Sequence, residues 1–297
     1  MRTRNDCDFV RVSAILVGMD DKIPNRILCS TGAIGYYPVN PDAALMMDVY
    51  PRLSADGYEV MIDRAVPPNA AEWSAQLRSA GIPVGMVHIG KATGECFSTD
   101  DPARHRDGLE KLAADLAIAR MFGADRAVLH LWGWPDNDRN FARTTGSLET
   151  GLAIAGKLGV ELLVETIPCV ERTLVERMRE LHESFPRLRF TVDSRLLAIQ
   201  DAIGAVMEAD WLWSDGLVAH VHVSDCRRNA DGVPEQRPIL QPGAGCIDFD
   251  AFFAGLRRHG YTGAITLEAP AVDPATRAVA VGMLNGSFAY IRAAMRA

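Results

Sequence analysis

The expected fold follows from three stretches near the carboxyl end of the chain: Val218-Ala-His-Val-His-Val-Ser-Asp225, Gln241-Pro-Gly-Ala-Gly-Cys-Ile-Asp248 and Gly260-Tyr-Thr-Gly-Ala-Ile-Thr-Leu-Glu268. The first and third each contain a short β-type run that ends in a polar side chain, His222 in one and Glu268 in the other. Together with the residues between them, they predict a strand, a Gly/Pro-rich loop, a helix and a second strand. In parallel α/β proteins, polar residues at the carboxyl ends of strands are where active sites form.

The same alternation of strand and helix runs through the chain from residue 26 onward. Eight strands are predicted, over residues 26–30, 58–63, 83–88, 127–132, 160–165, 189–193, 217–223 and 264–268. Helices are predicted between and after them, over residues 42–55, 70–80, 102–122, 143–158, 173–184, 197–213, 249–259 and 273–295. Alternating strands and helices indicate an α/β protein with a parallel sheet.

Eight repeats in 297 residues favour closure into one (β/α)8 TIM barrel. We expect one domain over residues 1–297, with residues 1–25 an N-terminal extension of uncertain structure. The alternative is an open, doubly wound sheet. That fold predicts a glycine-rich dinucleotide turn after an early strand, and Gly32-Ala-Ile-Gly35 is too weak a match.

The composition indicates which classes of partner are unfavourable and in which compartment we expect the protein. The net charge of −7 argues against nucleic acid and anionic membranes, because phosphate binding needs a basic surface. The six cysteines are scattered without a C-x-x-C pair, which indicates reduced thiols. No signal-type apolar region and no run of 18 apolar residues is present, so we expect a soluble cytoplasmic protein.

Polar residues end six of the predicted strands or lie near their ends: His88, His130, Glu165, Asp193, His222 and Glu268. Strand ends converge on one rim of a barrel, so these residues can share an ion. Three carboxylates and one histidine would suit one divalent ion: Mn²⁺, Mg²⁺, Co²⁺ or Zn²⁺. The alternative is that each residue is only solvated at the barrel mouth, and that His88 and His130 only hydrogen-bond to neighbours. His220 is interpreted as a core histidine or a support for His222.

These features resemble the xylose isomerase-like TIM barrels, which include ketose 3-epimerases, sugar phosphate isomerases, hydroxypyruvate isomerase, inosose dehydratase and endonuclease IV. The most specific stretches are Leu163-Val-Glu-Thr-Ile-Pro168, His220-Val-His-Val-Ser-Asp225 and Pro242-Gly-Ala-Gly-Cys-Ile-Asp248 with Gly260-Tyr-Thr-Gly263. The resemblance implies that one divalent ion is held by residues from strands five to eight. The implied ligands are Glu165, Asp193, His222 and Glu268.

The resemblance also implies residues that contact a sugar-like substrate. Glu171 stands six residues after the strand-five ligand, and Arg228 stands six residues after the histidine ligand, with Arg237 a second candidate for that role. Trp132, at the rim after strand four, could stack on a sugar face or simply pack beneath the loop. We therefore expect substrate contacts from His88, His130, Trp132, Glu171, Arg195 and Arg228.

One position departs from the family pattern. A histidine usually stands three residues after the strand-six aspartate, but here the run is Asp193-Ser-Arg-Leu196. This departure weakens a ketose 3-epimerase assignment and counts against an endonuclease. Arg195 would suit a carboxylate or phosphate on the substrate, or a salt bridge to a nearby acid.

The reaction implied is proton abstraction next to a carbonyl, with an enediolate intermediate and with Glu165 and Glu268 as catalytic carboxylates. The expected function is a metal-dependent isomerase or epimerase of a sugar or polyol ketone. The alternatives are a dehydratase of the inosose or dehydroshikimate type and a binding barrel that keeps only the metal site. Related barrels are often dimers or tetramers, so a homodimer or homotetramer is possible.

Overall fold

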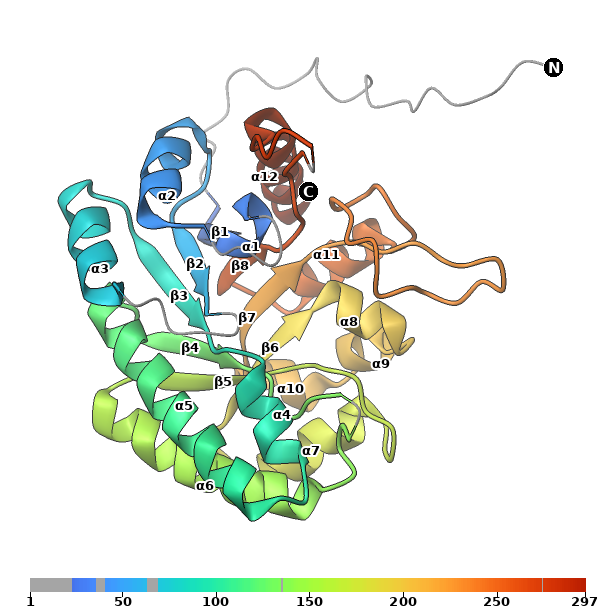
Figure 1. The fold of residues 1–297 in the computed structure, drawn as a ribbon. Coiled ribbons are helices and arrows are strands. Elements are labelled where there is room, and N and C mark those ends of the chain that lie inside the picture. Colours follow the sequence, from blue (N-terminus) through green and yellow to red (C-terminus); the bar gives the residue numbers. More distant parts are fainter. Residues whose placement is uncertain (1–22, 36–40, 63–68, 135, 274) are drawn as a thin grey trace.

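Eight parallel strands close into a barrel surrounded by helices (Figure 1). The computed structural model describes residues 23–35, 41–62, 69–134, 136–273 and 275–297. Each strand pairs with its sequence neighbours, and β1 pairs with β8 to close the ring. The strands are β1 Ile27–Ser30, β2 Tyr58–Met61, β3 Val84–His88, β4 Arg126–Leu129, β5 Glu161–Glu165, β6 Arg189–Asp193, β7 Val218–Val223 and β8 Ala264–Leu267. The prediction of a (β/α)8 TIM barrel is confirmed, and the open sheet is excluded.

Helices fill the connections between strands. They are α1 Thr31–Ile34, α2 Ala43–Val49, the 3₁₀ turn η1 Tyr50–Arg52, α3 Ala70–Ser79, α4 Ala92–Ser98, α5 Pro102–Phe122, α6 Phe141–Leu158, α7 Leu174–Ser184, α8 Ser194–Ile199, α9 Ile203–Met207, α10 Asp210–Ser214, α11 Phe249–Arg258 and α12 Val281–Arg296. Among the helices of the described residues, none combines the length and the apolar composition that a membrane crossing requires.

Local sequence signals explain the best-predicted helices. The Asp101 side chain accepts a hydrogen bond from the backbone of Ala103 at 2.8 Å, and Pro102 occupies the first turn of α5. Gly123 ends α5 with a left-handed φ of 77°. Thr173 and Glu176 form a reciprocal capping box at the start of α7. The predicted bounds of α5 are therefore confirmed, and those of α7 differ by one residue.

The predicted extents of four elements are wrong. The helix predicted over 42–55 stops at Val49 and continues only as η1, which contains Pro51. The helix predicted over 197–213 is three short helices, α8 to α10. The strand predicted over 127–132 ends at Leu129. Helix α12 begins at Val281 rather than at residue 273, because the Asp273 carboxylate caps a short turn through the backbone N–H groups of residues 275 and 276.

Two short helices are missing from the prediction, and some residues of the predicted elements lie outside the described part of the chain. The short helices α1 and α4 were not predicted. Of the predicted strand over 58–63, residue 63 lies outside the described residues. Of the N-terminal extension, residues 1–22 also lie outside them.

The core has two parts. The larger cluster packs the barrel against its helices, and the smaller one contains Leu28, Met86, Val128, Leu163 and Ala219. Successive strand residues point to opposite faces, so the residue two positions after a member of the smaller cluster lies on the same face. For four of the five members, all except Ala219, those positions hold polar side chains: Ser30, His88, His130 and Glu165. The barrel interior therefore changes from apolar to polar towards the carboxyl ends of its strands.

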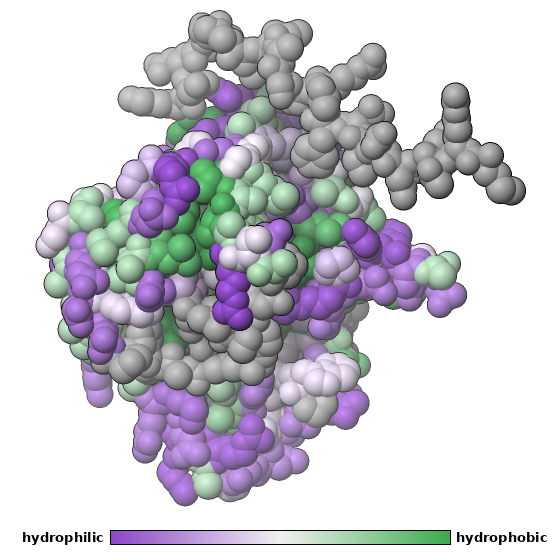
Figure 2. Space-filling view, turned by 45° about the horizontal axis from the view of Figure 1, so that its top comes forward, coloured by the Kyte–Doolittle hydropathy of each residue, from purple (hydrophilic) through white to green (hydrophobic). Residues whose placement is uncertain are grey.

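Few large apolar side chains lie outside this core. On the face drawn in Figure 2, hydrophilic residues cover much of the lower part, and hydrophobic residues gather in the upper half. In the described part of the chain, the exposed large hydrophobic residues are Met121, Trp134, Val170, Val233 and Met283. Trp134 and Val170 follow β4 and β5, and Val233 lies in the loop between β7 and α11, which extends away from the barrel (Figure 1).

Candidate metal centre

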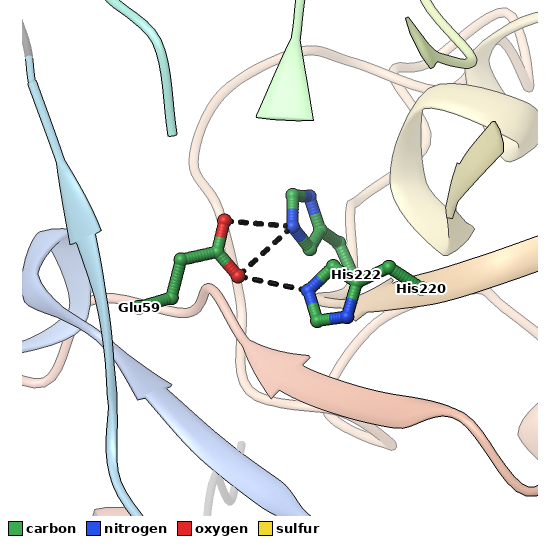
Figure 3. A group of neighbouring side chains, drawn as sticks. All are labelled: Glu59, His220 and His222. Atoms are coloured by element: carbon green, nitrogen blue, oxygen red, sulfur yellow. Dashed lines mark hydrogen bonds and ion pairs between the residues drawn. The ribbon is translucent and has the colours of Figure 1, made fainter. Parts of the chain in front are cut away.

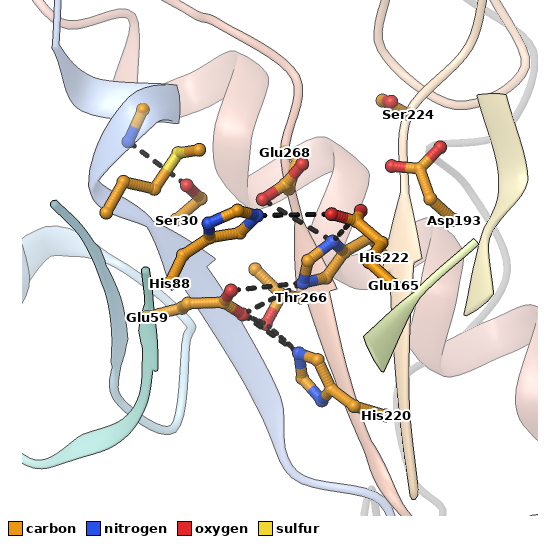
Figure 4. A network of polar contacts seen from close by, with 12 residues as sticks. Ser30, Glu59, His88, Glu165, Asp193, His220, His222, Ser224, Thr266 and Glu268 are labelled. Atoms are coloured by element: carbon orange, nitrogen blue, oxygen red, sulfur yellow. Dashed lines mark hydrogen bonds and ion pairs between the residues drawn. The ribbon is translucent and has the colours of Figure 1, made fainter. Parts of the chain in front are cut away.

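Four side chains converge at the carboxyl ends of β5 to β8 (Figure 4). They are Glu165, Asp193, His222 and Glu268, and one potential ligand atom from each lies within 4.8 Å of the others. We call these four residues the rim cluster. The four ligands implied by the sequence are therefore the four that the barrel brings together. Glu165, Asp193 and His222 are buried, and the Glu268 side chain is 12% exposed.

The rim cluster leaves two carboxylate oxygens without a hydrogen-bond partner. Asp193 accepts a hydrogen bond from the backbone of Leu196 at 2.6 Å through Oδ1, whereas its Oδ2 has none. Oε1 of Glu268 is also buried and has no hydrogen-bond partner among the described residues, although Nδ1 of His222 lies 3.6 Å away. A buried oxygen without a partner is costly, and a cation would remove that cost. The donor set of oxygen atoms and one imidazole nitrogen fits a hard divalent ion.

Glu165 is the most constrained member of the rim cluster. Its Oε1 lies 2.9 Å from Nδ1 of His222, and its Oε2 contacts Nε2 of His88, at 3.2 Å, and Nε2 of His130. Burial opposes ionisation of Glu165, but His130 and His222 outweigh it and hold the pKa of this carboxyl well below its usual value. Glu165 is therefore ionised and is a weak proton acceptor.

The other titratable groups respond to burial and charge in different directions. Burial raises the pKa of Asp193 to about 6, against the influence of Arg195. Burial lowers the pKa of His130 to about 4, although Glu165 acts in the opposite sense. For His222, burial lowers the pKa, but Glu268, Glu59 and Glu165 outweigh it and raise the pKa well above the usual value.

A second group of polar residues lies beneath the rim cluster (Figure 4). Glu59 of β2, His220 of β7 and Thr266 of β8 are fully buried and bonded to one another. We call these three residues the buried cluster. It touches the rim cluster through Nε2 of His222, which lies 3.0 Å from Oε1 of Glu59. His220 thus lies below His222, as its position two residues earlier predicts.

Sequence reasoning missed Glu59. The available signal was a carboxylate at the second position of a short, otherwise apolar strand, Tyr58-Glu-Val-Met61. A buried, unpaired carboxylate is expensive, so such a residue points to a buried partner. The partners lie on β7, at a separation along the chain of 161 residues for His220 and 163 residues for His222.

Two of the predicted substrate contacts touch the rim cluster directly. His88 and His130 both face Oε2 of Glu165, and their rings lie edge to face at 5.0 Å. His88 also contacts the Ile89 carbonyl at 2.9 Å through Nδ1. Each of these two oxygens can only accept a hydrogen bond, so both ring nitrogens of His88 must carry a proton. Burial lowers the pKa of His88, but Glu165 outweighs burial and raises the pKa.

Arg195 lies close to the rim cluster but forms no ion pair within the described part of the chain. Its Nε donates to Oγ of Ser224 at 3.3 Å, and its Nη1 to the carbonyl of Gln236 at 3.4 Å. Ser224 stands beside Asp193 in Figure 4. The guanidinium therefore sits over the ends of β6 and β7, and the alternative of a salt bridge finds no support in these contacts.

The remaining predicted contacts have other partners. Trp132 is buried, donates to the Pro168 carbonyl at 2.9 Å and packs edge-on against Phe141. Glu171 lies 3.5 Å from Arg139 on the surface. Arg228 is exposed and donates to the Gly232 carbonyl at 2.7 Å within the loop after β7. The structure does not bring these three side chains into the rim cluster, and their substrate roles stay predictions.

Asp225 fixes the loop that follows β7. Its carboxylate accepts hydrogen bonds from the backbone N–H groups of residues 226, 243, 245, 246 and 247. A Cβ at Gly245 would lie 2.1 Å from the Cys226 carbonyl oxygen, so only glycine fits there. These contacts show that Asp225 holds the turn after β7.

Comparison with solved structures shows the same fold at low sequence identity. A 3-keto-D-glucoside 4-epimerase from E. coli is 18% identical over 91% of this chain and 99% of that chain, with a TM-score of 0.67. An L-ribulose 3-epimerase is 17% identical over 92% and 95%, with a TM-score of 0.70. A D-allulose 3-epimerase from Methylomonas sp. is 16% identical over 91% and 98%, with a TM-score of 0.68.

A search of curated proteins found no match. The family described as xylose isomerase-like TIM barrel matches residues 51–284, which is more than half of the chain and includes all four residues of the rim cluster. The resemblance noted in the sequence is thereby confirmed. The chain belongs to the xylose isomerase-like TIM barrel family.

Proposed function

We propose that this protein is a divalent-metal-dependent isomerase or epimerase of a sugar or polyol ketone, acting by proton abstraction next to the carbonyl. The observation that carries the proposal is the rim cluster, with four potential ligand atoms within 4.8 Å and two buried carboxylate oxygens without partners. The similarity in fold between this protein and sugar epimerases supports an isomerase or epimerase reaction. Mn²⁺, Mg²⁺, Co²⁺ and Zn²⁺ are the candidate ions.

Glu165, Asp193, His222 and Glu268 would hold the ion, which would act as a Lewis acid on the substrate carbonyl when bound. Of the two carboxylates proposed as catalytic, Glu268 is the better placed to accept the α-proton. Its side chain is partly accessible, whereas Glu165 is buried and its pKa is depressed. Glu165 would then serve mainly as a ligand and would fix the opposite side of the substrate.

Three further side chains are proposed to bind substrate at the rim. Protonated His88 and the neighbouring His130 present polar groups beside Glu165. Arg195 presents a guanidinium that is free of any ion pair within the described residues, which suits an anionic or hydroxyl-rich part of the substrate. Trp132, Glu171 and Arg228 are retained as weaker candidates, because each has another partner.

Metal content tests the proposal first. Inductively coupled plasma mass spectrometry on untagged protein should find about one divalent ion per chain in the wild type and much less in Glu268→Gln. A wild type that contains no such ion and takes up none of the four candidates would refute the proposed chemistry. The binding-barrel alternative would then gain support.

The reaction itself is tested with a panel of ketoses in D₂O. Exchange of the α-proton with solvent, followed by NMR, supports an isomerase or epimerase. Loss of the β-hydroxyl, seen as an absorbing enone, would instead support the dehydratase. A metal-loaded protein that exchanges no proton in any ketose of the panel would count against both enzymes.

A further inference from the structure

The ring of His222 divides its two nitrogens between the rim cluster and the buried cluster. Nδ1 faces Glu165 at 2.9 Å and Glu268 at 3.6 Å. Nε2 faces Glu59, at 3.0 Å from Oε1 and 3.2 Å from Oε2. Only Nδ1 can therefore contribute to an ion held by the rim cluster.

A metal-binding imidazole must present a lone pair on one nitrogen and carry its proton on the other. Glu59 has no proton to give when ionised, so it can only accept from Nε2–H of His222. The carboxylate thus selects the tautomer in which Nδ1 is free to bind.

Other members of the buried cluster hold Glu59 in place. Its Oε2 accepts from Nε2 of His220 at 2.8 Å and from Oγ1 of Thr266 at 2.6 Å. Figure 3 shows Glu59 reaching from β2 towards both histidines of β7. Its side chain is fully buried, so solvent does not compete for these bonds. Both the position and the acceptor direction of the carboxylate are fixed before any ion binds.

We propose that Glu59 is a positioning residue that orients His222 and fixes its tautomer for metal binding through Nδ1. The inference rests on the proposed function, because it needs an ion in the rim cluster. Glu59 itself faces Nε2 and does not belong to the rim cluster. Its removal should weaken metal binding while leaving all four ligands present.

Glu59→Gln tests the role with little change of shape. Titration calorimetry with Mn²⁺ and with Co²⁺ should give a dissociation constant roughly 10- to 100-fold weaker than in the wild type. Thr266→Val is the matched control, since its hydroxyl touches Glu59 and His220 but not His222. It should leave the affinity within about threefold of the wild type, as the net contribution of one hydrogen bond implies.

Equal affinity in Glu59→Gln and the wild type would overturn the role of Glu59 and leave the metal site standing. A wild type that binds neither ion would overturn the proposed function as well, so the two failures are distinguishable. An equal loss in Thr266→Val and Glu59→Gln would reduce Glu59 to a structural member of the barrel and overturn the inference.

A measurement on the wild type covers the case in which Glu59→Gln does not fold. In Zn²⁺-loaded protein with ¹⁵N-labelled histidine, the Nε2 resonance of His222 should be that of a protonated nitrogen, and Nδ1 that of a metal ligand. The same spectrum with the proton on Nδ1 and the metal on Nε2 would overturn the inference.

Discussion

The rim cluster and the buried cluster meet at His222, yet their carboxylates differ in how many hydrogen bonds they accept. In the buried cluster, both oxygens of Glu59 accept hydrogen bonds from the protein. In the rim cluster, Oδ2 of Asp193 and Oε1 of Glu268 have no hydrogen-bond partner among the described residues. The protein thus satisfies the carboxylate of the buried cluster by itself, whereas two carboxylate oxygens of the rim cluster are left for a cation. Four experiments test this contrast, in order of decreasing expected effect.

Replacing a ligand should have the largest effect. Glu165→Gln removes a charged ligand, and we expect the affinity for Mn²⁺ to fall by more than the roughly 100-fold that bounds outer-shell effects. Glu161→Gln is the control, because Glu161 begins the same strand and pairs with Arg126 and Arg189 instead. Titration calorimetry on both variants measures the difference. Near-wild-type affinity in Glu165→Gln would mean that the ion binds elsewhere.

Filling the rim cluster should stabilise the fold. At a free Mn²⁺ concentration about 100 times its dissociation constant, the free energy of unfolding should rise by about 2.7 kcal/mol. For a chain of 297 residues, Tm should rise by roughly 4 °C in a thermal scan. A chelator should reverse the shift, and Thr266→Val should show the same shift from a lower starting Tm. An unchanged Tm in the wild type would contradict an ion site completed at the rim.

Acid should weaken metal binding because protons compete for the same atoms. Asp193, with a pKa of about 6, and His222, with a raised pKa, must both lose a proton to act as ligands. His222 is protonated below its raised pKa and Asp193 below about pH 6, so affinity should fall as the pH falls from 8 and more steeply below about pH 6, by roughly tenfold per pH unit for each proton displaced. Calorimetry in two buffers of different ionisation enthalpy counts the protons released. A dissociation constant independent of pH would exclude these two groups as ligands.

Replacing Ser30 should have the smallest effect, and it tests whether a loss of metal affinity is specific to the rim cluster. It stands near His88 at the barrel rim in Figure 4, but its hydroxyl caps α1 through the backbone of Gly32 at 3.1 Å. Ser30→Ala should lower the free energy of unfolding by about 1 kcal/mol in urea, because one cap is lost. Metal affinity should not change. A large loss of affinity in this variant would extend the rim cluster to β1.

Prediction from sequence succeeded where a signal is local. The capped helix α5 is predicted to the residue, since Asp101, Pro102 and Gly123 mark its ends. A predicted helix boundary is wrong where the local signal belongs to a different element. Asp273 caps a turn, and α12 begins eight residues later. The break of 197–213 into α8, α9 and α10 carried no strong stop signal that could have separated them.

For the site, the sequence alone determined which residue types end the strands and how many strands there are. Alternation along each strand and the strand–helix repeat are properties of neighbouring residues, so they placed Glu165, Asp193, His222 and Glu268 among six candidates, from which the family resemblance selected these four as ligands. The contact of Glu59 with His222 from across the barrel is a feature of the tertiary structure alone. Closure of the sheet brings the Glu59 side chain of β2 within hydrogen-bond distance of the histidine side chains of β7, and that contact depends on barrel geometry rather than on any pattern along the chain.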